Sequence, residues 1–290
     1  MRFMNRFFVI VILLAILTGC SASSTEKVFS GEKAYNHVQT QLGFGARIPG
    51  SKAIQETASY ITSTLQDNSW STQAQSFEYG GVALQNIIAK KGNGENIFII
   101  ATHYDTRAKA DRDVDSAFQK YPVPGANDGA SGTAVLLELS RVLAVSDDAQ
   151  VWLVFFDGED QGHLDGWEWS IGADYFVEHL TQNPHKVVII DMIGDAKLNV
   201  FQEKNSTPDL VEEIWTAAEE LDYLSYFIPE EKYTMIDDHV PFLNHGIPAV
   251  LLIDFDYDFW HTTQDTIENI SADSLQIVGN LLCHWLQSTQ

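Results

Sequence analysis

Two hydrophobic patterns alternate along most of this chain. Short, continuous apolar runs, typical of strands buried on both faces, lie at residues 97–102, 151–156, 187–190 and 249–253. Apolar residues spaced three and four apart predict helices at residues 32–44, 51–67, 131–146, 170–182, 208–223, 239–246 and 271–288. Residues 76–105 predict two strands joined by a Gly/Asn turn, and residues 198–203 a short strand. This alternation predicts an α/β domain with a mostly parallel sheet covered by helices on both faces.

One long segment follows neither pattern. Residues 107–127 give no strand or helix signal, and five charged side chains lie between Lys109 and Asp115. A loop of this length in a compact domain is usually functional or mobile. The sequence does not indicate what this loop recognises.

The first twenty residues have the features of an export signal. Arg2 and Arg6 precede an apolar run at residues 7–17 that is short for a membrane-spanning helix. The run ends in Leu-Thr-Gly-Cys, which resembles the lipobox of bacterial lipoproteins, with Cys20 as the lipidated first residue of the mature chain. An ordinary signal peptide that happens to contain a cysteine is the alternative. We expect a lipoprotein signal peptide at residues 1–20, a flexible tether at 21–31 and a single folded domain at 32–290, anchored to a membrane of the cell envelope.

The charge of the chain excludes some partners. With 40 acidic and 17 basic residues, its formal net charge is -23. Such a chain does not attract nucleic acid by its overall field, and it has no polybasic patch for anionic lipids. The predicted lipid anchor is therefore its only expected attachment to a membrane.

Acidic and histidine side chains follow all four apolar runs. In chain order they are His103 and Asp105, then Asp157, Glu159 and Asp160, then Asp191, and finally His261. Asp128 precedes the helix predicted at residues 131–146. Because ligands in open α/β sheets bind beyond the carboxyl ends of the strands, we expect these side chains to meet at one edge of the sheet. So many carboxylates would repel one another without a cation, and zinc prefers this mixture of imidazole and carboxylate ligands.

Each of these residues has a structural alternative. Asp128 could cap the following helix, and Asp157 could accept backbone N–H groups in a turn, which is the role we expect for it. Asp237 and Asp238 could both be helix caps, with His239 on the surface. The joint occurrence at four strand ends favours the metal site over these individual structural roles.

Nine short segments then resemble, in order, those of the zinc-exopeptidase superfamily that contains aminopeptidases and glutaminyl cyclases. The segments are GARIPGS, NIIAKKG, ATHYDTR, PGANDGASGTAVLLEL, FFDGED, IIDMIGD, DDHVPFL, IPAVLLI and WHTTQDT. The resemblance covers residues 44–282. It implies a three-layer α/β/α sandwich around a central twisted, mostly parallel mixed sheet.

The resemblance also implies roles for individual residues. Asp128, Asp160 and His261 match the ligands of one zinc ion, and Glu159 matches the residue that transfers a proton. In dizinc aminopeptidases a second zinc is held by residues matching His103 and Asp191. Both are present, so the ligand set alone is compatible with either activity.

Other features resemble the cyclases, above all the bacterial ones. Trp260 precedes His261 as in the cyclase Trp-His-Thr signature, and Trp169 follows the acidic pair at a similar spacing. Both would bind substrate; core packing is the alternative for each. The resemblance therefore implies a one-zinc glutaminyl-peptide cyclotransferase that converts N-terminal Gln of peptides or proteins to pyroglutamate and releases ammonia. Glu159 would share a proton with Asp191 or Asp237. The alternatives are a dizinc aminopeptidase and a non-catalytic, peptide-binding lipoprotein.

Overall fold

The structure is a computed structural model that describes residues 27–290. The predicted signal peptide, its Cys20 and most of the predicted tether lie outside the described residues. Phe29 is buried, and its ring lies against Gly279 of the last helix. The hydroxyl of Ser30 caps the first helix by accepting the N–H of Lys33. The folded domain thus begins a few residues before residue 32, and the predicted tether overlaps it.

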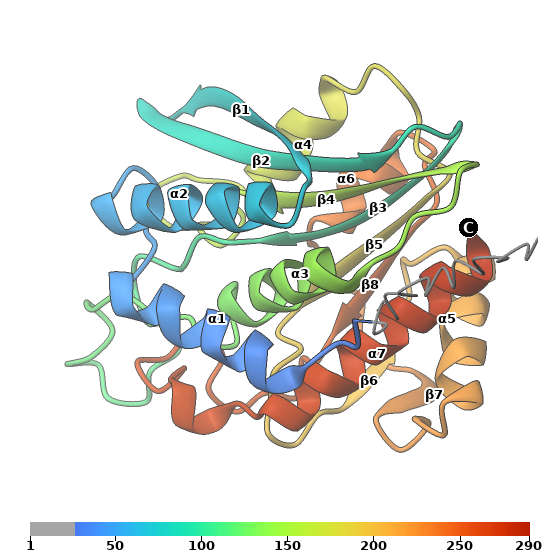
Figure 1. Ribbon diagram of the computed structural model, residues 1–290. Coiled ribbons are helices and arrows are strands. Elements are labelled where there is room, and N and C mark those ends of the chain that lie inside the picture. The colour runs from blue at the N-terminus through green and yellow to red at the C-terminus, as the bar shows by residue number, and fades with distance from the viewer. Residues whose placement is uncertain (1–26) are drawn as a thin grey trace, which may run out of the picture.

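A six-stranded sheet forms the centre of the domain (Figure 1). In spatial order its strands are β1 (Ser71–Tyr79), β2 (Val82–Gly92), β4 (Ala149–Phe156), β3 (Asn96–His103), β5 (Lys186–Asp191) and β8 (Ala249–Ile253). The last four are mutually parallel, whereas β1 and β2 are antiparallel to their neighbours. A separate parallel pair consists of β6 (Val200–Gln202) and β7 (Phe227–Glu231). The predicted mostly parallel mixed sheet is confirmed.

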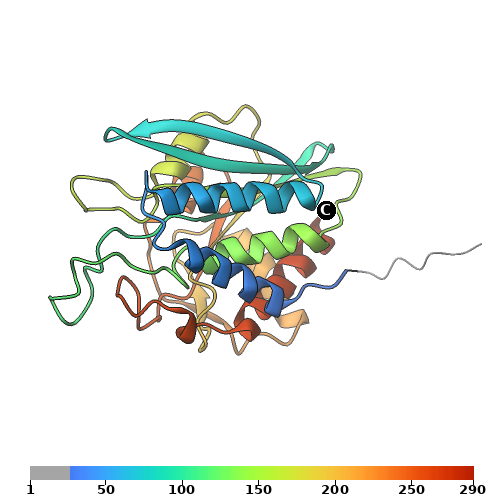
Figure 2. The same cartoon turned by 60° about the vertical axis from the view of Figure 1, so that its left-hand side comes forward.

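Helices cover both faces of the sheet, so the domain has three layers (Figures 1 and 2). The helices on one face are α1 (Gly31–Phe44), α2 (Lys52–Asp67), α3 (Ala130–Val142), α5 (Pro208–Glu220) and α7 (Ala272–Thr289). Those on the other are α4 (Ile171–Glu178) and α6 (His239–Asn244). Among residues 27–290, no helix is both long and apolar enough to cross a membrane.

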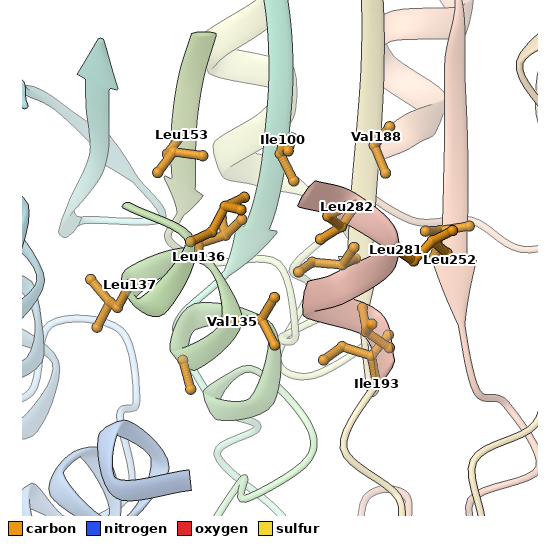
Figure 3. Close-up of a cluster of buried hydrophobic side chains, with 14 of the residues drawn as sticks. Ile100, Val135, Leu136, Leu137, Leu153, Val188, Ile193, Leu252, Leu281 and Leu282 are labelled. Carbon is orange, nitrogen blue, oxygen red and sulfur yellow. The ribbon is translucent and has the colours of Figure 1, made fainter. Parts of the chain in front are cut away.

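The continuous apolar runs are buried on both faces, as predicted. In β4, Leu153 and Phe155 belong to the core under α3 and α7, whereas Trp152 and Val154 belong to the core under α4 and α6. Figure 3 shows the first core, in which Leu153 and its neighbours on adjacent strands face the leucines of α3 and α7. Two packed faces leave these strands no solvent-exposed side, which accounts for the lack of alternating polar residues in these runs.

The structure differs from the predicted elements in several places, and helix α3 ends at Val142 rather than residue 146. The segment predicted as two strands contains three, because β1 is an additional edge strand with no fully buried residue and thus no apolar run. Strand β7 was not predicted either, since only its first residue, Phe227, is buried. Helix α4 ends at Glu178 rather than residue 182.

The register of the parallel strands aligns their carboxyl ends. His103, the last residue of β3, lies opposite Phe156, the last residue of β4. Asp191, which ends β5, lies opposite Ile253, which ends β8. The side chains that follow these strands are therefore brought to one edge of the sheet.

Candidate active site

Two groups of side chains at this edge have the geometry of metal ligands, and Asp128 belongs to both. In each group, one potential ligand atom per residue lies within 4.8 Å of the others, and all the residues are buried. The first group is Asp128, Asp160 and His261; the second is His103, Asp128 and Asp191. The structure thus brings together all five residues that the family resemblance pairs with zinc.

The first group leaves buried polar atoms without a partner. Oδ2 of Asp128 and both carboxylate oxygens of Asp160 accept no hydrogen bond, although each is inaccessible to solvent. Oδ1 of Asp160 lies 2.9 Å from Nε2 of His261, yet the two atoms do not form a hydrogen bond of acceptable geometry. Unsatisfied buried carboxylates are costly, so these atoms fit a cation that all three side chains would ligate. One imidazole and two carboxylates match the ligand preference of catalytic zinc.

The second group is partly satisfied by its own contacts. Nε2 of His103 forms a hydrogen bond with Oδ1 of Asp191 at 3.0 Å and lies 3.2 Å from Oδ1 of Asp128. Nδ1 of His103 lies 3.4 Å from Asp105. Surrounding carboxylates, led by Asp191, raise the pKa of the His103 imidazole well above its usual value, although burial opposes them. The imidazole of His103 and the carboxylates around it therefore partly satisfy one another.

A cavity of about 310 Å³ opens beside the first group. Trp169, Trp260 and Phe255 line it with aromatic surface, and Glu159 and Asp237 line it with carboxylates. The Trp260 ring centre is 4.0 Å from that of His261, and the Trp169 ring is stacked on His261 at 6.0 Å. Both tryptophans are half-buried, so they are walls of the cavity rather than members of the sealed core.

Burial and mutual repulsion raise the pKa values of several of these acids. Burial, reinforced by Asp237, raises the pKa of Glu159 well above its usual range, although His103 opposes the shift. Burial and the charge of Asp191 raise the pKa of Asp237 to about 7. Burial and the charge of Asp128 raise the pKa of Asp160 to about 6. A raised pKa lets a carboxyl group hold a proton more readily, which suits Glu159 to acid–base chemistry.

Asp128 behaves differently because histidines surround it. Burial alone would raise its pKa, but the hydrogen bond and charge of His103, with the charges of His261 and Arg107, lower it overall. Asp128 does not cap the next helix, which was its structural alternative: Gly129 occupies that position, and no side chain caps the helix. Asp157 belongs to neither ligand group and accepts a backbone N–H, but this is the N–H of Gln85 in β2, at 3.0 Å, rather than one in its own turn.

Three buried residues whose role was not predicted hold the site in place. The Asp105 carboxylate accepts the N–H groups of Glu159 and Asp160 at 3.1 and 3.3 Å and thereby fixes the turn that carries both acids. The Asp265 carboxylate accepts the N–H groups of Asn127 and Asp128 at 2.8 and 3.1 Å. From the other side, the buried guanidinium of Arg47 donates to the carbonyls that flank Asp128, among them that of Gly125 at 2.6 Å.

A further contact that was not predicted supports the side of the cavity that carries Asp237. Glu203 is buried and accepts hydrogen bonds from His239 at 3.1 Å and from the N–H of Met235 at 2.9 Å. The interpretation of His239 as a surface residue is wrong, since its side chain is fully buried. Asp238 lies at the start of α6 but its side chain makes no capping bond.

We expect the Glu203 contact to make stability depend on pH in the acid range. Burial would raise the pKa of Glu203, but His239 and the backbone N–H groups lower it from 4.5 to about 2. This stabilisation is complete above pH 4.5 and is lost as the pH falls towards 2; it amounts to roughly 3 kcal/mol. In urea unfolding, the free energy of unfolding of Glu203→Gln should therefore be lower than that of the wild type at pH 7, and this difference should shrink below pH 4. A loss of unfolding free energy that does not change with pH would contradict this prediction, as would a loss equal to that of the exposed control Glu230→Gln.

The irregular segment at residues 107–127 folds against the site. The Arg107 guanidinium binds both carboxylate oxygens of Asp111 at 2.7 and 2.8 Å and donates to the carbonyl of Asp160 at 3.2 Å. The Asp113 carboxylate accepts both the N–H and the hydroxyl of Thr263, at 2.9 and 2.6 Å. This segment therefore holds the turns that carry Asp160 and His261.

Comparison with known proteins places these features in a family. The family model described as "Peptidase family M28" matches residues 86–286. Aminopeptidase YwaD of Bacillus subtilis is 32% identical over 55% of this chain, a match that spans only 36% of YwaD. The crystal structure of Porphyromonas gingivalis glutaminyl cyclase is 30% identical, covers 91% of this chain and 99% of its own, and has a TM-score of 0.86. A zinc-dependent exopeptidase from Parabacteroides distasonis is 27% identical over 89% and 98% of the two chains, with a TM-score of 0.84.

Proposed function

This chain belongs to peptidase family M28, whose zinc-dependent fold it shares, and we propose that it is a one-zinc glutaminyl-peptide cyclotransferase. The observation that carries the proposal is the difference between the two ligand groups. Asp160, which belongs only to the first group, has both carboxylate oxygens buried and unpaired, whereas Asp191, which belongs only to the second, is hydrogen-bonded to His103. The match to P. gingivalis glutaminyl cyclase over almost the whole of both chains supports the same activity.

In the proposed reaction, the α-amine of an N-terminal Gln attacks its own γ-carbonyl carbon. A ring C–N bond forms, the bond to the amide nitrogen breaks, and ammonia leaves. Because both reacting groups belong to one residue, holding the side chain folded lowers much of the barrier. Trp260 and Trp169, which wall the cavity, suit this task.

In this proposal Glu159, which lines the same cavity, transfers the proton. Its carboxylate would take the proton of the attacking amine and give it to the leaving nitrogen, so that no net proton is consumed by the enzyme. Asp237 and Asp191 also line the cavity and favour a proton shared among the three acids. A zinc ion bound by Asp128, Asp160 and His261 would supply a Lewis acid that polarises the γ-carbonyl.

A dizinc aminopeptidase is the second candidate, because His103, Asp128 and Asp191 form a complete second ligand group. Glu159 would then activate water for hydrolysis of the first peptide bond. The similarity to aminopeptidase YwaD favours this candidate over part of the chain.

Product analysis with metal counting tests both candidates. The zinc-loaded protein is incubated with a peptide that begins with Gln, and the products are weighed by mass spectrometry. A product lighter by one ammonia indicates cyclisation, and a product that lacks its first residue indicates hydrolysis. Neither product, with zinc bound, would contradict both and favour a non-catalytic peptide-binding lipoprotein.

We also propose that Cys20 is lipidated and anchors the protein to a membrane of the cell envelope. The Leu-Thr-Gly-Cys sequence after an apolar run supports this. Cys20→Ser should shift the full-length protein from the membrane fraction to the soluble fraction, as measured by fractionation and immunoblotting. Cys283→Ser is the matched control, because Cys283 lies in α7 of the folded domain. Continued membrane association of Cys20→Ser would reject the anchor.

A further inference from the structure

The cavity is strongly acidic. Its titratable lining consists of five carboxylates and one imidazole: Asp128, Glu159, Asp160, Asp191, Asp237 and His261. No lysine or arginine is among its lining residues. A zinc ion bound by the first ligand group would offset part of this charge. The remaining carboxylates disfavour an acidic side chain on the next residue of a peptide whose first residue enters the cavity.

One arginine lies against Trp260, an aromatic residue that lines this cavity. The backbone N–H of Arg112 donates to the carbonyl of His261 at 3.2 Å. Its guanidinium carbon lies 5.0 Å from the centre of the Trp260 ring, which lines the cavity. Figures 1 and 2 both show the loop that carries Arg112 beside the segment between β8 and α7. The guanidinium is thus held next to one of the aromatic side chains that line the cavity.

The charge of Arg112 is not neutralised by its neighbours. On the same loop, Arg107 is paired with Asp111, and Lys109 is paired with Asp165 at 3.0 Å. Arg112 is exposed, and across residues 27–290 its side chain forms neither an ion pair nor a hydrogen bond. The Arg112 guanidinium is therefore available to a carboxylate of a bound peptide.

We propose that Arg112 forms a subsite for an acidic side chain on the second residue of the peptide substrate. The inference rests on the proposed function, because it requires the N-terminal residue to occupy the cavity. A guanidinium binds a carboxylate through two parallel hydrogen bonds, and its weak hydration favours such contacts at an aromatic surface. Because the pair is exposed, we expect it to change kcat/KM by only roughly 1.5- to 5-fold.

A charge-reversal experiment tests this subsite. Three peptides are compared, each with Gln first, with Glu, Ala or Lys second, and with an amidated C-terminus that removes the terminal carboxylate. In the wild-type enzyme, kcat/KM for the Glu peptide relative to the Lys peptide should exceed the same ratio in Arg112→Gln. In Arg112→Glu the preference should reverse towards the Lys peptide. Higher salt should weaken both preferences, since the pair is exposed.

Two controls distinguish a charge-specific subsite from a general loss of peptide binding. Lys109→Gln removes an already paired cation of the same loop and should leave the Glu-to-Lys ratio unchanged. Dissociation constants of the three peptides in a Glu159→Gln background give the same comparison without turnover. An equal loss for all three peptides in Arg112→Glu would overturn the subsite and assign Arg112 to the support of Trp260. Failure of even the Ala peptide to react in the wild type would overturn the proposed function instead.

Discussion

Replacing Glu159 by Gln should abolish turnover while leaving zinc bound. Glu159 lines the cavity beside the first ligand group but is not a member of either group. Glutamine keeps the size of the side chain but cannot take up the amine proton. Loss of a positioned general base typically costs roughly 100- to 10,000-fold in rate. We therefore expect kcat to fall by that factor with no change in zinc content, measured by steady-state kinetics and elemental analysis.

The matched control for this variant is Asp157→Asn. Asp157 lies two residues earlier in the same turn and is equally buried, but it contacts Gln85 rather than the cavity of the active site. Burial and the charge of Asp105 raise the pKa of Asp157 well above its usual value. Asn keeps an oxygen that can accept the N–H of Gln85, so this contact can be retained. The control should keep most of its activity. A Glu159→Gln enzyme that turns over at nearly the wild-type rate would show that the proton moves through another group.

The different roles of Glu159 and Asp160 could be predicted from the sequence only in part. The parallel strands end in register, so the residues after each apolar run had to meet at one edge, and the sequence located that edge. Which acid ligates and which moves a proton came from the family resemblance. The structure adds the physical basis, since it places Glu159 in the cavity and Asp160 against His261.

The supporting residues could not be predicted, because their contacts join segments far apart in the chain. Asp265 binds the N–H of Asp128, 137 residues away, and Glu203 binds His239 from the β6 side. Each contact involves a backbone group or a buried polar partner that leaves no periodic signal. Edge strand β1 was missed for a related reason: one of its faces is open to solvent, so it lacks the apolar run that marked the central strands.

The proposal of a single zinc ion rests on the first ligand group and is tested by Asp160→Ala. Asp160 belongs only to the first ligand group, and both of its carboxylate oxygens are buried without a partner. Changes outside the ligand set already cost roughly 10- to 100-fold in metal affinity, so loss of a ligand should cost more than about 100-fold. We expect the purified variant to lose its zinc on dialysis, as measured by elemental analysis and competition with a chelator.

Asp191→Ala is the informative counterpart, because Asp191 belongs only to the second group. Its carboxylate already forms a hydrogen bond with His103, so a one-zinc enzyme should keep its metal when Asp191 is removed and lose only activity. A dizinc enzyme should instead fall from two zinc ions to one.

The position of Asp160 explains why the Asp160→Ala variant should be more severe than Asp191→Ala. The N–H of Asp160 is held by Asp105 and its carbonyl by Arg107, so the backbone that carries this ligand is fixed in place. Unchanged zinc content in Asp160→Ala would mean that the unpaired oxygens of the first group are not metal ligands, and the one-zinc proposal would fail with them.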